Sequence, residues 1–354
     1  MRKAGKTNIR FVAQAAGVSP ATASRALNGS GSVSEELTQR VFSAARELGY
    51  PISGGFKGKK TIAFIMPGVC NTYYSKTLTG VFDVVQPAGY RVQILLSGSE
   101  PEQELACLRE ACNPDTAGII IAPITDTDPR QALPGLADIP MVVTGPRHLT
   151  DGPIHVYLDH DEAAYQGTRY LLRLGRKKIA FVVYSWTQRI QSYEALMEEC
   201  RAPHQGCFTT CDAYSGYCRA LDEAGLQPNP SLLAYGGMSY ESGRNCARQL
   251  LCSDTDFDAV IVPNDRCGAG MMNALQAQGF HVPSQVSLVC LDSDLIAKVV
   301  SPTLTSMASA NYELGQQCAY QLMHLINGEP AHNVVLEPKL LIENSTQFNV
   351  GRSQ

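Results

Sequence analysis

Residues 12–29 read VAQAAGVSPATASRALNG, and this stretch decides the fold of the amino-terminal part of the chain. Apolar side chains repeat at helical spacing up to Gly17. Ser19 followed by Pro20 is typical of the start of a second helix, because serine caps free N–H groups and proline fits the first helical position. Since only Ala16-Gly17-Val18 separate the two segments, the stretch predicts a helix-turn-helix unit.

Helical patterns on both sides of this unit extend it to a small α-helical head. Asn8 is placed to cap a first helix that runs to Ala16, and Asn28 with the glycine after it ends the second helix. A third helix is expected from a cap at Ser34 to Leu48, with acidic side chains in its first turn, where the helix dipole favours them. The apolar faces of the three helices predict one shared core.

The charge of the chain is divided unevenly, although its formal net charge is −4. The first 60 residues hold ten Lys/Arg against three Asp/Glu, a net charge of +7, whereas the remaining 294 hold nineteen against thirty, a net charge of −11. A polyanion is therefore attracted by the head and repelled by the rest of the chain.

The exposed face of the second predicted helix carries the candidate DNA-contacting residues, because the second helix of such a unit lies in the major groove. Arg25 can donate two parallel hydrogen bonds to a guanine edge. Short hydroxyl and amide side chains reach phosphate oxygens. An alternative interpretation is a three-helix bundle without DNA binding, because polar caps occur in any such bundle. The candidates are Asn8, Ser19, Pro20, Ala21, Thr22, Ser24, Arg25 and Asn28.

The same stretch resembles the head of the LacI/GalR (lactose-repressor/galactose-repressor) family. The resemblance runs through Val12-Ala13-x-x-Ala16-Gly17-Val18-Ser19-x-x-Thr22-x-Ser24-Arg25-x-Leu27-Asn28-Gly29 and continues in Glu47-Leu48-Gly49-Tyr50. It implies a sequence-specific transcription regulator, a repressor, that reads a near-palindromic double-stranded DNA operator as a homodimer. Phe11 departs from the family pattern, because an acidic residue is usual there.

Beyond residue 60, apolar β-type runs alternate with helical spacers. The expected strands are 61–66, 91–96, 118–122, 140–143, 178–184, 259–262 and 286–291. This alternation predicts an α/β body with two lobes, each a parallel sheet flanked by helices. Residues 51–60 form a Gly/Lys linker where the family has a hinge that folds on DNA, and three glycines there disfavour a helix.

The body also resembles that family, whose two-lobed body shares the fold of periplasmic sugar-binding proteins. The resemblance implies a division of the chain into domains. These are a DNA-binding domain at 1–50, the linker at 51–60, and an effector-binding and dimerisation domain at 61–354, with lobe one at about 61–160 and 294–325 and lobe two at about 161–293 and 326–354.

The resemblance further implies an effector site between the lobes, for a carbohydrate or a derivative of one. Asn264 and Asp265 follow one predicted strand and Asp292 follows the next, although such residues also cap the following helix. The candidates are Tyr73, Arg147, Met238, Asn264, Asp265 and Asp292. Ala213 stands where many members have an effector-binding arginine, and residues 185–211 look inserted. An alternative is a corepressor-dependent regulator whose body binds a protein partner.

Other classes of protein are disfavoured by what the sequence lacks. Neither a signal-peptide core nor a run of about 18 apolar residues occurs, so we expect a cytoplasmic protein without a membrane partner. The densest cysteine group is Cys200, His204, Cys207, Cys211 and Cys218. Its spacing fits no common zinc site, and no nucleophile motif accompanies it. We expect no metal, no cofactor, no catalytic residue and no enzymatic activity.

Overall fold

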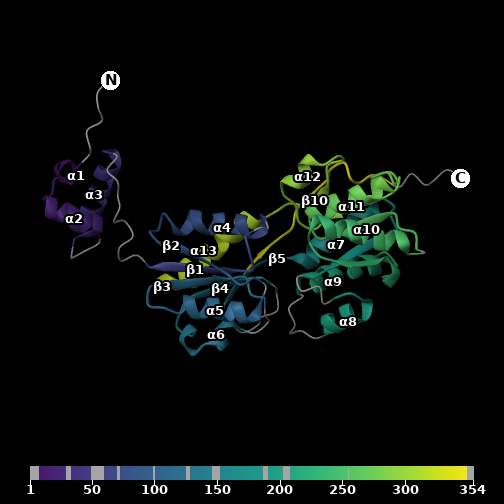
Figure 1. Ribbon diagram of the computed structural model, residues 1–354, viewed down its shortest axis with the longest axis horizontal. Coiled ribbons are helices and arrows are strands. Elements are labelled where there is room, and N and C mark those ends of the chain that lie inside the picture. Colours follow the sequence, from purple (N-terminus) through teal and green to yellow (C-terminus); the bar gives the residue numbers. More distant parts are fainter. Residues whose placement is uncertain are drawn as a thin grey trace, which may run out of the picture.

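The structure is a computed structural model (Figure 1). It describes residues 8–28, 33–48, 60–69, 72–98, 100–124, 128–145, 152–185, 190–201, 208–253 and 255–348. The head consists of α1 (Ile9–Ala16), α2 (Pro20–Asn28) and α3 (Glu35–Glu47), as the capping residues predicted. Their inward side chains, among them Val12, Ala23 and Val41, are buried in a core of their own.

A parallel sheet forms the centre of the first lobe. Its strands are β1 (Thr61–Met66), β2 (Arg91–Leu96), β3 (Thr116–Ile121), β4 (Met141–Thr144), β5 (Ile154–Leu158) and β11 (Val334–Leu336). Their order is β11-β5-β4-β3-β1-β2, and every neighbouring pair is parallel. Strand β1 turns Ile62 and Phe64 to one face and Ala63 and Ile65 to the other. Because both faces are covered, the strand is apolar throughout.

A second sheet forms the centre of the second lobe. Its strands are β6 (Ile179–Tyr184), β7 (Leu233–Gly236), β8 (Ala259–Val262), β9 (Ser287–Cys290), β10 (Thr305–Met307) and β12 (Leu340–Leu341). Their order is β12-β10-β9-β8-β6-β7, and only the β10–β12 pair is antiparallel among these pairs. The two-lobed α/β architecture that the sequence predicted is confirmed.

Helices cover both faces of each sheet (Figure 1). One face of the first sheet is covered by α4 (Thr72–Val85) and α13 (Asn311–Asn327). The other face is covered by α5 (Pro101–Ala111), α6 (Pro129–Ala132) and η1 (Pro134–Leu136). The second lies between α7 (His160–Arg173), α8 (Tyr193–Arg201) and α9 (Phe208–Glu223) on one side and α10 (Tyr240–Cys252), α11 (Asp265–Ala277), α12 (Leu295–Val299) and η2 (Pro230–Leu232) on the other.

The chain passes between the two sheets at three places within its described part. It leaves the first sheet after β5, returns to it between β10 and α13, and leaves again between β11 and β12. The predicted lobe boundaries at 294 and 326 are therefore wrong, because residues 305–307 pair in the second sheet and residues 334–336 pair in the first. These strands are too short to show a clear alternation of apolar and polar residues.

Glycines set the spacing of the main helix pairs. A Cβ atom on Gly216 of α9 would meet the backbone carbonyl oxygen of Asp161 in α7. The pairs α10–α11 and α4–α13 contain the same kind of contact, at Gly243, Gly270, Gly80 and Gly315. At these points the two helix backbones touch without a side chain between them. Separately, none of the helices in the described ranges is long and apolar enough to cross a membrane.

Candidate functional site

The turn between α1 and α2 is fixed by its backbone and by one side chain from α3. Gly17 has φ +66° and ends α1 in the left-handed region, where glycine is favoured. The N–H of Val18 donates to the carbonyl oxygen of Ala13 at 2.9 Å, and Arg40 donates to the carbonyl oxygen of Ala16 at 3.0 Å. The third helix thus holds the angle at which α2 leaves the turn.

The amino-terminal turn of α2 presents hydroxyl groups to solvent. Ser19 Oγ accepts a hydrogen bond from the N–H of Thr22 at 3.0 Å and shares a second hydrogen bond with the Thr22 hydroxyl at 2.8 Å. Arg25 is exposed one turn later, with Nε 3.4 Å from the carbonyl oxygen of Ala21. These side chains form one polar edge on the exposed side of α2, and the guanidinium group carries four N–H donors in addition to its Nε–H.

The other head candidates surround this edge. Pro20 and Ala21 are exposed in the first turn of α2, and Ser24 is half-buried. Asn8 is exposed and caps α1, accepting from the N–H of Arg10. The backbone of Asn28 ends α2, but its side chain lies outside the described residues.

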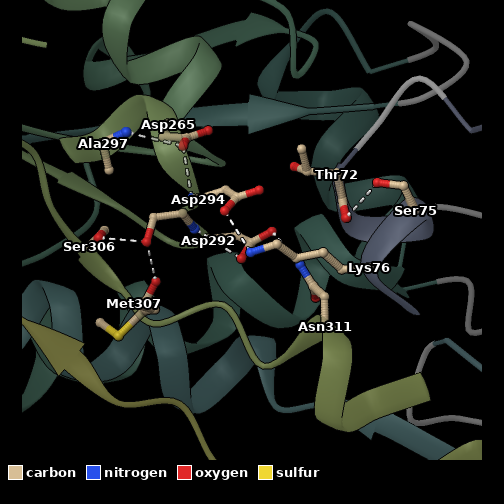
Figure 2. Close-up of polar contacts among 11 residues, drawn as sticks. Thr72, Ser75, Lys76, Asp265, Asp292, Asp294, Ala297, Ser306, Met307 and Asn311 are labelled. Atoms are coloured by element: carbon tan, nitrogen blue, oxygen red, sulfur yellow. Dashed lines mark hydrogen bonds and ion pairs between the residues drawn. The ribbon is translucent and has the colours of Figure 1, made fainter. Parts of the chain in front are cut away.

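Apart from Arg147, which lies outside the described residues, the effector candidates follow strands of the two sheets, on the side of each sheet that faces the opposite lobe. In each sheet the strand order reverses at one interior strand. Strand β1 has β2 on one side and β3 on the other, and strand β6 has β7 on one side and β8 on the other. In open α/β sheets, ligands bind beyond the carboxyl ends of the strands at such a reversal of strand order. Figure 2 shows the polar side chains that meet there. We use the term interlobe site for Lys76, Asp265, Asp292, Asp294 and Asn311.

Asp292 links the carboxyl end of β9 to the first lobe. Its carboxylate accepts from the N–H of Ser293 at 2.9 Å and from Asn311 Nδ2 at 3.3 Å, at the start of α13 (Figure 2). Burial raises the pKa of this carboxyl to about 6, and the charges of Asp265 and Asp294 act in the same direction. The two hydrogen bonds lower it, but they do not compensate for the loss of water.

A direct ion pair joins the lobes beside Asp292. Lys76 Nζ on α4 lies 2.6 Å from Asp294 Oδ1, in the loop between β9 and α12 (Figure 2). The lysine side chain is 41% exposed and the aspartate side chain 23% exposed, so the pair is only partly removed from water. Its contribution to stability is modest for that reason. Its position nevertheless makes it sensitive to the distance between the lobes.

Asn264 and Asp265 use their side chains as caps. Asn264 accepts from the N–H of Cys267 at 2.9 Å and so begins α11. Asp265 reaches across to α12, where its Oδ2 atom accepts from the N–H groups of Asp294 at 2.8 Å and Ala297 at 3.2 Å. The capping role that the sequence left open is thus the role that both residues show in this structure. Asp265 also positions the aspartate that pairs with Lys76.

The remaining effector candidates are placed as follows. Tyr73, in the first turn of α4, has its pKa raised by burial, with the charge of Asp292 acting in the same direction. Met238 follows β7 and is half-buried against the core that contains Tyr184. Arg147 lies outside the described residues. Tyr73 and Asp292 are thus neighbours, whereas Met238 belongs to the edge of the second lobe.

Three residues of the interlobe site were absent from the sequence-based prediction: Lys76, Asp294 and Asn311. Lys76 lies one turn after the candidate Tyr73 on the same helix, and this spacing could have indicated that both side chains lie on one face of the helix. Asn311 gave no signal of its own, although the return of the chain to the first lobe was predicted at about residues 294–325. Ala213, in the place of an expected arginine, is fully buried and offers no polar group to a ligand.

Comparison with known proteins agrees with this geometry. Residues 8–51 match the family described as "Bacterial regulatory proteins, lacI family", and residues 168–346 match the "Periplasmic binding protein-like domain". The "HTH-type transcriptional regulator RegA" of Clostridium saccharobutylicum is 29% identical over 350 residues, which cover 96% of this chain and 99% of RegA. The "Catabolite control protein A" of Priestia megaterium is 27% identical over 336 residues, covering 93% and 95%.

Solved structures show the same architecture. The "transcriptional regulator CelR-cellobiose complex" superposes with a TM-score of 0.68 at 24% identity, covering 96% of this chain and 99% of that one. The regulator GntR from Chromobacterium violaceum gives a TM-score of 0.68 at 26% identity over 81% of this chain and 99% of GntR. The head, the body and their order along the chain all correspond, and the chain belongs to the LacI family of bacterial regulatory proteins, which are DNA-binding transcription regulators.

Proposed function

We propose that this regulator is a repressor that binds a near-palindromic DNA operator as a homodimer and responds to a small carbohydrate-like effector held between its lobes. The observation that carries the proposal is that polar side chains of both lobes meet at the interlobe site, through Lys76 with Asp294 and Asn311 with Asp292. A ligand that inserts among these groups changes the preferred distance between the lobes, because it replaces contacts that span them.

The head supplies the DNA contacts in this proposal. Arg25 reads a guanine edge, and Ser19, Thr22, Ser24 and Asn28 contact phosphate oxygens at the amino end of α2. Support comes from the exposure of Arg25 and from the positive charge of the first 60 residues. Residues 1–50 act as the DNA-binding domain and residues 51–60 as the linker to the body. A repressor of this kind acts on chromosomal DNA, so its place of action is the cytoplasm.

The effector contacts are assigned by chemistry. Carboxylate and amide oxygens at Asp292 and Asn311 accept hydrogen bonds from hydroxyl or amino groups. Tyr73 adds an aromatic face, and Met238 and Arg147 complete the proposed set. Asn264 and Asp265 contribute by holding the loop that carries Asp294, as their caps suggest.

Exposed apolar side chains support a homodimer. Phe82 on α4 is 48% exposed, and Ile94 and Leu96 on the edge strand β2 are 45% and 44% exposed. Leu295 and Val299 on α12 are also exposed, so both lobes present apolar surface. Contiguous exposed apolar surface commonly marks an interface between proteins. Two subunits joined in this way space their heads for the two halves of one operator.

Selection of random DNA duplexes on the purified protein tests the core of the proposal. We expect enrichment of a near-palindrome whose two halves have a fixed spacing, and sedimentation of the complex as two subunits per duplex. Operator affinity is then measured with and without each member of a panel of mono- and disaccharides. A binding effector should shift that affinity by about 5- to 150-fold, the usual range of coupling between two sites.

A second candidate is a regulator whose body is controlled by a protein partner. The burial of Ala213, in place of an arginine that contacts effectors, favours it by weakening the small-molecule site. Exposed Tyr320 on α13 offers part of a contact surface. If the protein binds its operator but no carbohydrate, amino sugar or nucleoside changes that affinity, control by a protein partner replaces control by a small-molecule effector as the proposal.

A further inference from the structure

The interlobe site carries more acidic than basic side chains. Asp265, Asp292 and Asp294 come from the second lobe, whereas Lys76 and Asn311 come from the first. With every group ionised, three carboxylates and one ammonium give these five residues a net charge of −2. Lys76 Nζ lies 2.6 Å from Asp294 Oδ1, so the ammonium of the site is already paired (Figure 2). The excess of negative charge attracts a cation and repels an anion.

Asp292 pairs with no cation within the described ranges. Its carboxylate accepts from the Ser293 N–H at 2.9 Å and from Asn311 Nδ2 at 3.3 Å, which is long for an N–H···O bond. Burial raises the pKa of Asp292 to about 6, and the charges of Asp265 and Asp294 act in the same direction. An adjacent cation would lower that pKa. Asp292 is half-buried rather than sealed, so a ligand can reach it and supply the missing positive charge.

Asn311 adds a hydrogen-bond acceptor beside this carboxylate. The residue is 1% exposed, and its Nδ2 group faces Asp292. An ionised carboxylate only accepts hydrogen bonds, so the amide turns its nitrogen toward Asp292 and leaves Oδ1 as an acceptor. No donor in the described part of the chain reaches this buried Oδ1 atom. A buried acceptor without a donor is costly, and a ligand that donates to it removes that cost.

We propose that the effector carries a primary amine, as an amino sugar does, and that its ammonium group binds between Asp292 of the second lobe and Asn311 of the first. This inference rests on the proposed function and names the chemical class of its effector. An ammonium group has three N–H donors, so it can donate to the Asp292 carboxylate and to Asn311 Oδ1 together. A hydroxyl group has one donor and no charge. The bound amine joins the two lobes, as the ammonium of Lys76 already does through Asp294.

The same charges disfavour phosphorylated and carboxylated sugars. Ala213, where an effector-binding arginine was expected, is buried and offers no cation to an anionic group. Its neighbour Asp212 is acidic. Burial raises the pKa of Tyr184 at the end of β6, and the charges of Asp212 and Asp292 act in the same direction. The second lobe thus brings negative charge to this strand end from both α9 and the end of β9.

Calorimetric titration of the purified full-length protein, without DNA, tests the ligand class. The panel pairs glucose, galactose and mannose with their amino derivatives, and adds N-acetylglucosamine and the phosphate ester of glucosamine. At pH 7 the ammonium form of these amines and the ionised form of Asp292, whose pKa is about 6, both predominate.

We expect an amino sugar to bind at least about tenfold more tightly than its hydroxyl and N-acetyl counterparts, because charge-assisted hydrogen bonds are stronger than neutral ones. The phosphate ester should bind more weakly than glucosamine, because the site repels anions. A neutral sugar that binds as tightly as its amino derivative overturns the proposal, and so does a panel in which no amino sugar binds.

Two variants assign the contact. Asp292→Asn keeps the shape of the side chain but removes its charge, so it should abolish the preference for the amine. Asp256→Asn is the matched control, at a side chain that is 90% exposed, and should retain that preference. Lys76→Met removes a competing ammonium and should bind the amine at least as tightly as wild type. A preference that survives in Asp292→Asn overturns the proposal, as does a loss of more than about threefold in Lys76→Met, which would make Lys76 a ligand contact.

Operator affinity decides whether the bound amine is the effector. Fluorescence anisotropy on the selected operator, with and without the amine, should show a shift of about 5- to 150-fold. An amine that binds but leaves operator affinity unchanged is not an effector and overturns the proposal. If only a neutral sugar shifts operator affinity, the proposed function stands and this inference fails. If the protein binds no operator, the proposed function fails instead, and the calorimetric preference for amines is judged on its own.

Discussion

Replacing Asp292 by asparagine is expected to remove a pH dependence from the stability of the protein. In the folded chain the pKa of this carboxyl is about 6 instead of its usual 3.8, because burial disfavours the charge. The folded state therefore holds more protons than the unfolded state between these two values, and the free energy of unfolding falls as pH rises through that window. A difference of 6 minus 3.8, at 1.36 kcal/mol per pKa unit, gives a loss of up to about 3 kcal/mol by neutral pH.

The asparagine variant retains the shape of the site but has no charge to bury. It can keep only one of the two hydrogen bonds that Asp292 accepts, from Ser293 N–H and Asn311 Nδ2, which costs about 1 kcal/mol at every pH. Relative to wild type it should therefore be less stable by about 1 kcal/mol near pH 3 and more stable by about 2 kcal/mol near pH 7.5.

Urea unfolding followed by far-ultraviolet circular dichroism, at several pH values across this range, measures the difference. Asp256→Asn is the matched control, because the Asp256 side chain is 90% exposed and its replacement should shift stability little at any pH. A constant difference between Asp292→Asn and wild type across the whole range would refute the reasoning, since it would show that Asp292 does not titrate abnormally in the folded protein.

Three further outcomes are expected. Arg25→Ala should lose about 1–3 kcal/mol of affinity for the selected operator and much less for unrelated DNA, measured by fluorescence anisotropy; equal losses would assign Arg25 to phosphate contacts. Gly216→Ala should cost about 1–3 kcal/mol or more in thermal unfolding, because its Cβ meets the carbonyl oxygen of Asp161, and an unchanged melting temperature would contradict that contact. A double-mutant cycle with Lys76→Met and Asp294→Asn should show a coupling of about 0.2–1 kcal/mol that shrinks in high salt; zero coupling at low salt would remove the ion pair as an interlobe contact.

Much of the fold follows from local rules that the sequence displays directly. Asn8, Ser19 and Ser34 each cap the helix that was predicted to begin after them. The apolar run at 61–66 becomes an interior strand buried on both faces. In each case the deciding interaction lies within a few residues along the chain, so pattern and propensity are sufficient to find it.

The parts that escaped prediction depend on contacts between distant segments. Strand β7 at Leu233–Gly236 was not predicted, because four residues are too few to establish a period. Lys76 and Asp294 are 218 positions apart, and nothing local to either one indicates the other. The places where the chain changes lobes were misjudged for the same reason. Arg25, by contrast, was identified early because its helix and its exposure are both encoded locally.

The glycine contacts between paired helices have a mechanical consequence for signal transmission. Where Gly216 lies against α7, and Gly315 against α4, no side-chain layer exists to be compressed or sheared. We therefore expect the two helices of each pair to move together as one rigid unit. Relative motion of the two lobes is then expected at the three short segments of chain that connect them. The glycine contacts thus determine which helices of this protein move together.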